Sequence, residues 1–328
     1  MRLRMVPENT KLDFFRYWRA TFGLSVLALV ASIAIFFVVG LNYGIDFLGG
    51  TTIRTESATP VDVASYRAAI APLGLGDVAI TEVFDPSFAA DQNVASIKIQ
   101  AQPGEEAVSN DTIAAIGAAL QAIDPQMVMP FPSIESVGPE VSGELIQTAV
   151  IAVVLAILAV LVYIWLRFEW QFSLGAVAAL VHDIVVTIGV FSLLQIQFDL
   201  AIIAALLTIV GYSLNDTVVV FDRVRENLRK YKKRALKEVL SLSINETLSR
   251  TVMTSVTTLL ALISLYVLGG DVIRGFVFAM IWGVIVGTYS SVFVASAILL
   301  FFGVKRDWTK KDAGGGSNAG TQFGNVDA

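Results

Sequence analysis

The chain has 328 residues, of which 55% are hydrophobic and only 16% are charged, with a mean hydropathy of +0.70 and a net charge of −5. Soluble domains carry about 25% charged residues, so this composition predicts a polytopic membrane protein with at least one water-exposed segment. The lack of cysteine excludes disulfides and thiolate metal sites, and the single histidine, His182, excludes a multi-histidine metal site within the chain.

Six apolar runs are near the length of about 20 residues that a helix needs to cross a bilayer. The first of them follows Lys11, Arg16 and Arg19 and is too long for a signal-peptide core, so we expect it to be retained as a span. In chain order, the predicted spans are residues 20–41, 144–166, 171–194, 200–221, 251–268 and 274–303.

Basic residues gather in three segments, 1–19, 222–250 and 304–328, which all lie on one side of a protein with six spans. Positive charge marks the cytoplasmic side, so both termini are predicted to be cytoplasmic. The 222–250 segment is expected to form a helix near the anionic leaflet, where its charge either sets topology alone or also binds a partner. The tail is rich in Gly, Asn and Ser and is predicted to be disordered.

The segment 42–143 contains no span and few basic residues, which predicts a location outside the cytoplasm. Its patterns follow the order β-α-β-β-α-β, which is that of the ferredoxin-like split βαβ fold. The expected fold is therefore an α-helical polytopic membrane protein with six transmembrane helices and an α+β, ferredoxin-like periplasmic domain between the first two. The predicted elements are a strand at 51–56, a helix at 61–73, strands at 78–84 and 94–99, a helix at 109–123 and a strand at 127–135.

Ionisable residues interrupt the apolar spans. His182 and Asp183 lie in the third span, Asn215 and Asp216 lie in the fourth, and Arg250 precedes the fifth. A rise of about 1.5 Å per residue puts Asp216 about two turns from the cytoplasmic edge and Asp183 near mid-membrane. A carboxylate costs several kcal/mol in hydrocarbon, so one that is kept there usually serves ion or proton movement or binds a polar partner.

These residues allow two interpretations. If Arg250 approaches and retreats from Asp216, the carboxylate can take up and release a proton, because a nearby cation favours the charged form and desolvation favours the neutral one. Such a pair would couple proton flow to a conformational change. The alternative is a fixed buried ion pair, or carboxylates that are simply hydrogen-bonded to the hydroxyls of the fifth span. His182 fits helix packing or hydrogen bonding better than an obligate relay role.

Glycines mark turns and close helix packing. The Gly44–Gly50 segment follows the first span, where its glycines suit a tight exit turn. Asp46 within it either caps that turn or lines the outer mouth of a polar path. In the sixth span, Gly283 and Gly287 form a small-xxx-small pair, which predicts a close approach to another helix.

Several motifs together resemble the SecD/SecF family of bacterial protein-export membrane subunits, within the resistance-nodulation-division superfamily. The resemblance covers nearly the whole chain, and it is specific because the motifs occur together. One departure is Gln197, in a short outer turn where family members often carry an acid. The matching residues are Gly44, Asp46, Gly49 and Gly50 after the first span, Gly138 and Pro139 before the second, His182 and Asp183 in the third, Gly211, Tyr212, Asn215, Asp216, Asp222 and Arg223 along the fourth, and Arg250 before the fifth.

The resemblance implies a non-enzymatic accessory subunit of a protein translocase in the bacterial inner membrane. It implies that the chain acts with SecD, the SecYEG channel and YajC, and uses the proton motive force to promote late stages of preprotein export. The coupling ion is then the proton with no other cofactor, the translocating unfolded polypeptide is a partner, and nucleic acid is not. In the family, the residues tied to proton conduction fall on Asp216 and Arg250.

Two other classes of protein fit the sequence less well. A proton-driven solute or lipid exporter of the same superfamily typically carries two copies of the six-span unit and much larger outer domains. An intramembrane enzyme needs a nucleophile with a base or two facing catalytic aspartates, and the chain has no cysteine, no Gly-x-Ser-x-Gly motif and no His-Glu-x-x-His motif. Half of a pseudo-symmetric transporter is expected to function only with a second six-span subunit.

Overall fold

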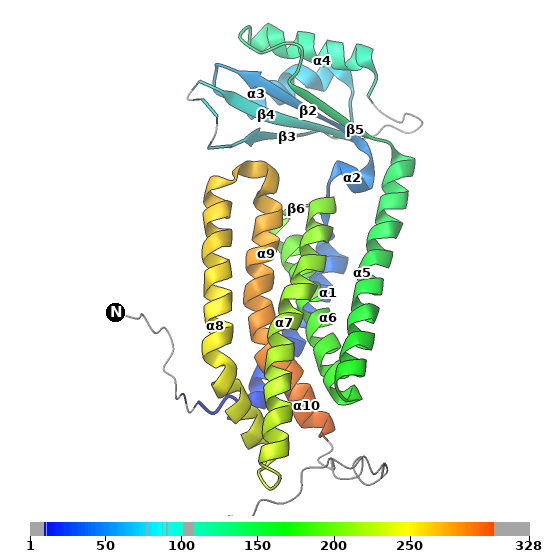
Figure 1. Ribbon diagram of the computed structural model, residues 1–328. Coiled ribbons are helices and arrows are strands. Elements are labelled where there is room, and N and C mark those ends of the chain that lie inside the picture. The colour runs from blue at the N-terminus through cyan, green and yellow to red at the C-terminus, as the bar shows by residue number, and fades with distance from the viewer. Residues whose placement is uncertain are drawn as a thin grey trace, which may run out of the picture.

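The computed structural model describes residues 10, 12–76, 78–86, 88–89, 91–100 and 108–304. A bundle of long helices carries a small α+β domain at one end, which we call the outer end (Figure 1). Within the described residues, six helices are long and apolar enough to cross a membrane, which confirms the predicted number of spans. The predicted disordered tail lies outside the described residues.

Five continuous helices and one interrupted helix form the spans. Their bounds are Trp18–Val39 for α1, Pro139–Arg167 for α5, Trp170–Leu194 for α6, Leu200–Lys230 for α7 and Leu236–Leu268 for α8, while the sixth span comprises α9 (Gly270–Ser290), the π-helical η2 (Ser291–Ala295) and α10 (Ser296–Phe302). The centre of the bundle is formed by α6, α7 and the sixth span, whereas α1, α5 and α8 lie at the periphery and expose most of their side chains.

The basic segment 222–250 forms a helical hairpin that extends two spans, rather than a helix of its own. α7 continues to Lys230 and α8 begins at Leu236, so only a short turn separates them. The physical reason is a buried apolar stripe beneath the charges. Val224 and Leu228 belong to the same hydrophobic cluster as the start of α6 and the end of the sixth span. The charged positions obscure this stripe in the sequence, and packing of the stripe continues both helices beyond the apolar spans.

The α+β domain has the predicted order of strands and helices. Its elements are β2 (Gly50–Ser57), α3 (Val63–Ile70), the 3₁₀ turn η1 (Ala71–Leu73), β3 (Val78–Val83), β4 (Asn93–Gln100), α4 (Asn110–Ile123) and β5 (Ser133–Val137). The strands form one antiparallel sheet in the order β3-β4-β2-β5. Both helices cover the face that points away from the bundle (Figure 1), and Ile53, Ile97 and Ile116 are fully buried between the layers.

The last strand of the domain is shorter than the sequence predicts. It begins at Ser133, whereas the prediction placed a strand over 127–135. Met127 and Phe131 are apolar because they pack into the core of the domain, not because they alternate along a strand. Two prolines in this stretch cannot donate to a sheet ladder, which fits its irregular path.

The two chain connections of the domain lie side by side. Gly50 at the start of β2 is paired with Val137 at the end of β5. The first connection contains β1 (Asn42–Tyr43) and the short α2 (Ile45–Leu48), and β1 pairs in parallel with β6 (Gln197–Phe198) between α6 and α7. The domain is therefore attached to the bundle where the start of β2 and the end of β5 meet, which we call the attached edge.

Candidate functional site

Asp183 on α6 is the centre of a buried polar cluster. The residue is 0% exposed. Its Oδ2 accepts hydrogen bonds of 2.7 Å from the hydroxyls of Ser213 on α7 and Ser290 on α9. Its Oδ1 lies 3.0 Å from Nδ1 of His182. Three helices therefore meet at one carboxylate, and both of its oxygens have partners.

His182 is held on two sides. Besides the contact with Asp183, its ring lies 6.4 Å from the ring of Tyr289, centroid to centroid. The Tyr289 hydroxyl in turn lies 2.9 Å from the Ser25 hydroxyl and donates to the Thr21 carbonyl, both on α1. This geometry supports the packing and hydrogen-bonding role that the sequence favours for the histidine.

Hydroxyl groups continue the cluster towards the hairpin between α7 and α8. Thr217 on α7 lies 2.9 Å from the Ser291 hydroxyl in the π-helical turn, and both residues are almost fully buried. Nearer α8, the Ser255 and Thr288 hydroxyls are 2.7 Å apart. A hydroxyl can donate and accept at the same time, so a row of hydroxyls can relay a proton in either direction.

Asp216 differs from Asp183 in its lack of partners. It lies about one helical turn beyond Ser213, is 3% exposed, and its Oδ2 has no hydrogen-bond partner among the described residues. Arg250 is exposed at the hairpin side. No hydrogen bond or ion pair within 4.0 Å joins the two side chains in the described part of the chain, although the arginine is near enough to act on the carboxylate electrostatically. The fixed ion pair that the sequence left open as an alternative is therefore not formed between these two side chains.

The remaining predicted residues of the fourth span point in different directions. Asn215 and Gly211 lie on the exposed side of α7, so Asn215 does not join the Asp183 cluster. The Tyr212 hydroxyl is buried without a hydrogen-bond partner among the described residues, as is the Thr251 hydroxyl on α8. An exposed amide in a membrane-spanning helix lacks water to bind, and it is normally satisfied by a neighbouring helix.

Asp222 and Arg223 belong to the hairpin and not to the buried cluster. Asp222 forms an ion pair with Arg167 at the end of α5, with 3.4 Å between Oδ1 and Nη2. Arg223 pairs with Glu226 at 2.6 Å and with Glu246 on α8 at 2.7 Å. These contacts connect α7 with its two neighbours, and such exposed pairs contribute little stability individually.

The glycine motif shapes the entry into the α+β domain. Gly49 and Gly50 have φ values of 73° and 140°, which lie in the range that favours glycine. Gly44 donates a 2.8 Å hydrogen bond from its N–H to the Phe198 carbonyl beside α7. At the exit from the domain, Gly138 precedes the first turn of α5 and Pro139 begins it, where a missing N–H costs nothing.

Asp46 lies in α2, but its side chain caps the start of α7. Its Oδ2 accepts a 3.0 Å hydrogen bond from the N–H of Leu200, in the first turn of α7. Asp199 is the N-cap of the same helix, and its Oδ1 accepts a 3.2 Å hydrogen bond from the N–H of Ile202. Two carboxylates therefore hold the outer end of the helix that carries Asp216, where the helix dipole favours negative charge.

Sequence reasoning missed the contribution of the sixth span. Ser290 and Ser291 bond to Asp183 and Thr217, yet they lie in an apolar run with no charged neighbour. The available signal was a pair of adjacent serines in the second half of a span that is mostly apolar. Ser213 appeared in the sequence as one hydroxyl among several, and nothing there distinguished it as a carboxylate partner.

The fold and this cluster define a class of protein: a six-span membrane protein with buried carboxylates at the centre of its bundle and an α+β domain at one end. The family is equally clear. Residues 34–61 match the SecD/SecF GG motif, and residues 115–305 match the family described as protein export membrane protein SecD/SecF, C-terminal. The chain belongs to the SecD/SecF family of protein export membrane proteins.

Similar proteins support this assignment over the full length. The chain is 59% identical to a protein translocase subunit SecF from Cereibacter sphaeroides, with 100% of this chain and 99% of the relative covered. It is 58% identical to the SecF of Rhodobacter capsulatus, with 95% of each covered. A solved structure of SecDF from Thermus thermophilus, described as translocon-associated, matches with a TM-score of 0.79 at 35% identity.

That SecDF chain is much longer than this one. The match covers 91% of this chain but only 39% of SecDF. A second structure, of SecDF in a super-membrane-facing form, matches 92% of this chain and 40% of SecDF at 36% identity with a TM-score of 0.64. The two solved structures therefore differ in how closely they match the same chain.

Proposed function

We propose that this chain is a SecF-like accessory subunit that, together with SecD, uses the proton motive force to promote late stages of preprotein export through SecYEG. The observation that carries the proposal is the environment of Asp216, which is a buried carboxylate without a hydrogen-bond partner for Oδ2 in the described part of a membrane-spanning bundle. An unpartnered buried carboxylate is costly as an anion, so it favours exchange of a proton over a fixed charge.

The arrangement around Asp216 suits a two-state device. Arg250 lies at the rim while Asp216 lies inside. In one state the arginine approaches and the carboxylate is charged, and in the other the arginine is withdrawn and the carboxylate holds a proton. The buried hydroxyls of Thr217 and Ser291 are neighbours that can carry the proton onward. The difference between the states is what couples proton passage to movement of the helices.

A second six-span subunit completes this device. The exposed side of α7 carries Thr208, Gly211 and Asn215, which are small or polar where lipid would favour large apolar residues. Such a surface suits close packing against another helix, with the Asn215 amide hydrogen-bonded across the contact. The length of the Thermus SecDF chain is consistent with a second half of this kind. We assign that role to SecD, with YajC as a further associated protein.

The same proposal sets the location and orientation. The protein lies in the bacterial inner membrane with both termini in the cytoplasm, because the basic hairpin and the basic end segments share one side. The α+β domain is then periplasmic and ferredoxin-like, at the side where an exported polypeptide emerges. The proton is the coupling ion, and the subunit is not itself an enzyme. The two SecDF structures with different similarity to this chain are consistent with a domain that moves during the cycle.

The substitution Asp216→Asn tests the proposal, because it keeps size and removes charge. We expect the variant to assemble with its partner, measured by co-purification, but to lose the stimulation of export by an imposed proton gradient in inverted membrane vesicles. Glu238→Gln makes the same chemical change at an exposed position of α8 and is expected to respond as the parent does. Full stimulation in the Asp216→Asn vesicles would refute the assignment.

A further inference from the structure

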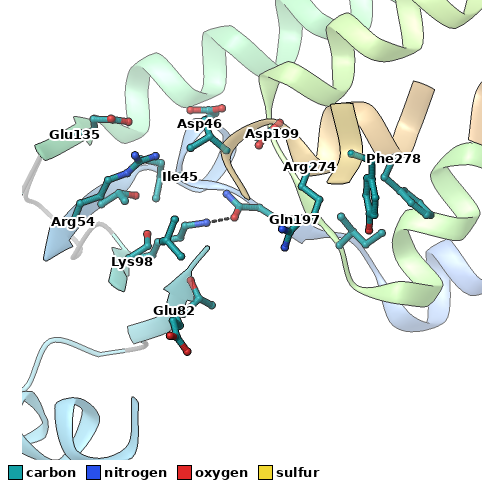
Figure 2. Close-up of a pocket in the computed structure, with 18 residues that line it drawn as sticks. Ile45, Asp46, Arg54, Glu82, Lys98, Glu135, Gln197, Asp199, Arg274 and Phe278 are labelled. Atoms are coloured by element: carbon teal, nitrogen blue, oxygen red, sulfur yellow. Dashed lines mark hydrogen bonds between the residues drawn. The ribbon is translucent and has the colours of Figure 1, made fainter. Parts of the chain in front are cut away.

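A polar cleft separates the α+β domain from the outer end of the bundle. Its volume is about 480 Å³. On the domain side it is bounded by the uncovered face of the sheet, and on the bundle side by the α6–α7 connection and the start of α9 (Figure 2). Both sides contribute charges. The charged lining residues are Arg54, Glu82, Lys98 and Glu135 of the domain and Asp46, Asp199 and Arg274 of the bundle.

Lys98 bridges this cleft. It lies on β4, on the sheet face without helices, and its Nζ donates a hydrogen bond to Oε1 of Gln197 on β6 (Figure 2). Burial lowers the pKa of Lys98, and the carboxylates of Asp199 and Asp46 oppose that shift. A half-buried ammonium group is stabilised only when acceptors and negative charges surround it. The hydrogen bond between Lys98 and Gln197 therefore joins the α+β domain to the outer end of the bundle in a charged environment that suits it.

The residues that line the cleft with Lys98 include the groups that hold α7. Asp46 and Asp199 each accept a backbone N–H from the first turn of that helix. Gln197 directly precedes this turn, and its strand pairs with the exit of α1. A force on the Lys98 ammonium is thus applied to the end of the helix that carries Asp216.

The attachment of the domain makes Lys98 sensitive to its position. Both covalent connections run through the edge where Gly50 pairs with Val137. β4 lies on the other side of β2 from β5, so Lys98 is set away from this edge. A rotation of the domain about its attached edge would separate Lys98 from Gln197 while leaving the chain connections in place.

We propose that Lys98 is a positioning residue: its hydrogen bond to Gln197, across the cleft that Asp199 and Asp46 also line, holds the domain docked on the bundle, and this contact must open and close during each export cycle. The inference rests on the proposed function. It adds the element through which movement of the domain reaches α7 and through which the state of α7 reaches the domain.

A reversible cross-link tests whether the contact must open. The chain has no cysteine, so Lys98→Cys with Gln197→Cys gives one unique pair, which a short bis-methanethiosulfonate reagent can bridge and a reductant can release. The matched control is Thr51→Cys with Ser136→Cys, whose parent hydroxyls are 2.8 Å apart within the domain. We expect the bridged cleft pair to lose gradient-stimulated export and to regain it on reduction, while the bridged control pair keeps it.

The outcomes separate the two proposals. If the cross-linked Lys98→Cys, Gln197→Cys protein supports gradient-stimulated export as fully as the cross-linked control, the role of Lys98 is overturned. The proposed function is left intact by that result. A parent protein that shows no stimulation by the gradient overturns the proposed function, and this inference with it.

A labelling experiment tests docking without measuring export. Ser96 lines the cleft and is 6% exposed, so Ser96→Cys reports opening through its rate of reaction with a water-soluble maleimide. Loss of one charge-assisted hydrogen bond shifts an equilibrium by about tenfold. We expect Lys98→Met to raise the labelling rate by about that factor, and Gln197→Glu, which supplies a full charge, to lower it. Arg67→Met, on α3 at the far face of the sheet, is expected to leave the rate unchanged. Equal rates in the parent and Lys98→Met would overturn the proposal.

Discussion

The Ser290 hydroxyl donates a 2.7 Å hydrogen bond to Oδ2 of Asp183, which connects the sixth span to the third across 107 residues of sequence. The same oxygen also accepts the Ser213 hydroxyl, so Asp183 is fully partnered where Asp216 is not. The bundle therefore contains two buried carboxylates in different situations. Asp183 anchors three helices, whereas Oδ2 of Asp216 has no hydrogen-bond donor among the described residues.

Removal of the donors to Asp183 should destabilise the bundle. We expect Ser290→Ala to lower the free energy of unfolding by about 1 kcal/mol, since one hydrogen bond to a buried group is lost. The double variant with Ser213→Ala should lose more than twice that amount, because Oδ2 then keeps no donor. Thermal unfolding in detergent measures both, with Ser264→Ala on the exposed face of α8 as the control. Equal melting temperatures for all three variants would contradict the anchoring role.

The close packing of the sixth span against α7 depends on glycine. A β-carbon on Gly283 would overlap the Ile209 side chain, and one on Gly287 would lie 3.0 Å from Cβ of Ser213. We expect Gly283→Ala to destabilise the protein by about 1–3 kcal/mol, because the helices must move apart. Gly23→Ala on α1 is a matched control, since nothing lies within 4 Å of its position. It should be neutral or stabilising by about 0.5–1 kcal/mol.

Stability of the α+β domain should depend on pH through Tyr66. Burial and the neighbouring Asp124 raise the pKa of Tyr66 to about 12, from 10.0 in an unfolded chain, and its hydroxyl donates to Oδ2 of Asp124. The folded domain holds the phenolic proton more tightly than the unfolded chain. The stability that this provides is complete below pH 10 and is lost as the pH rises towards 12.

The substitution Tyr66→Phe isolates this effect. We expect it to cost about 1 kcal/mol at neutral pH, where a buried hydrogen bond is lost, and to remove the additional alkaline loss of stability. Pulse proteolysis with subtilisin at a series of urea concentrations, at pH about 8 and about 11, measures the domain in the intact protein. A difference between parent and variant that stays constant between the two pH values would argue against the raised pKa.

The stability of the hairpin between α7 and α8 should depend on one buried amide. Asn227 is 1% exposed, and its Nδ2 donates to the Ser243 hydroxyl at 3.0 Å and to Oε2 of Glu246 at 2.6 Å. We expect Asn227→Ala to cost about 1–3 kcal/mol, because two hydrogen bonds between α7 and α8 are lost and Oε2 of Glu246 keeps only Arg223 as a donor among the described residues. Lys233→Ala in the exposed turn should change stability by less than about 0.5 kcal/mol. Faster proteolysis at the hairpin in Lys233→Ala than in Asn227→Ala would refute the assignment.

The sequence predicted those parts of the fold that depend on local pattern. Apolar length identified the six candidate spans that the described residues contain, and alternation identified β3 over nearly its observed extent. The prediction differed where packing outweighs pattern. Val224 and Leu228 pack into a buried cluster and continue α7 beyond its apolar run, although charged residues surround them in the sequence. Met127 packs into the domain core without being part of a strand.

The candidate site was predictable in its charges but not in its partners. Asp183 and Asp216 stand out because carboxylates are rare in apolar runs. Their different environments depend on which face of each helix meets a neighbour, and this follows from tertiary packing. The same limit applies to Lys98 and Gln197, which are 99 residues apart. Nothing in either local sequence indicates that the sheet of the domain rests above this particular turn.

The π-helical turn at Ser291–Ala295 contains one residue more than a regular α-helical turn would. In a regular α-helix, successive residues are about 100° apart, so straightening this turn would rotate everything beyond it by that angle. The buried side chains of Ala297 and Leu299 would then leave their present surroundings. The π-helical turn therefore lets α9 and α10 face different directions around the helix axis. Ser290 and Ser291 can face α6 and α7 while α10 keeps its own packing.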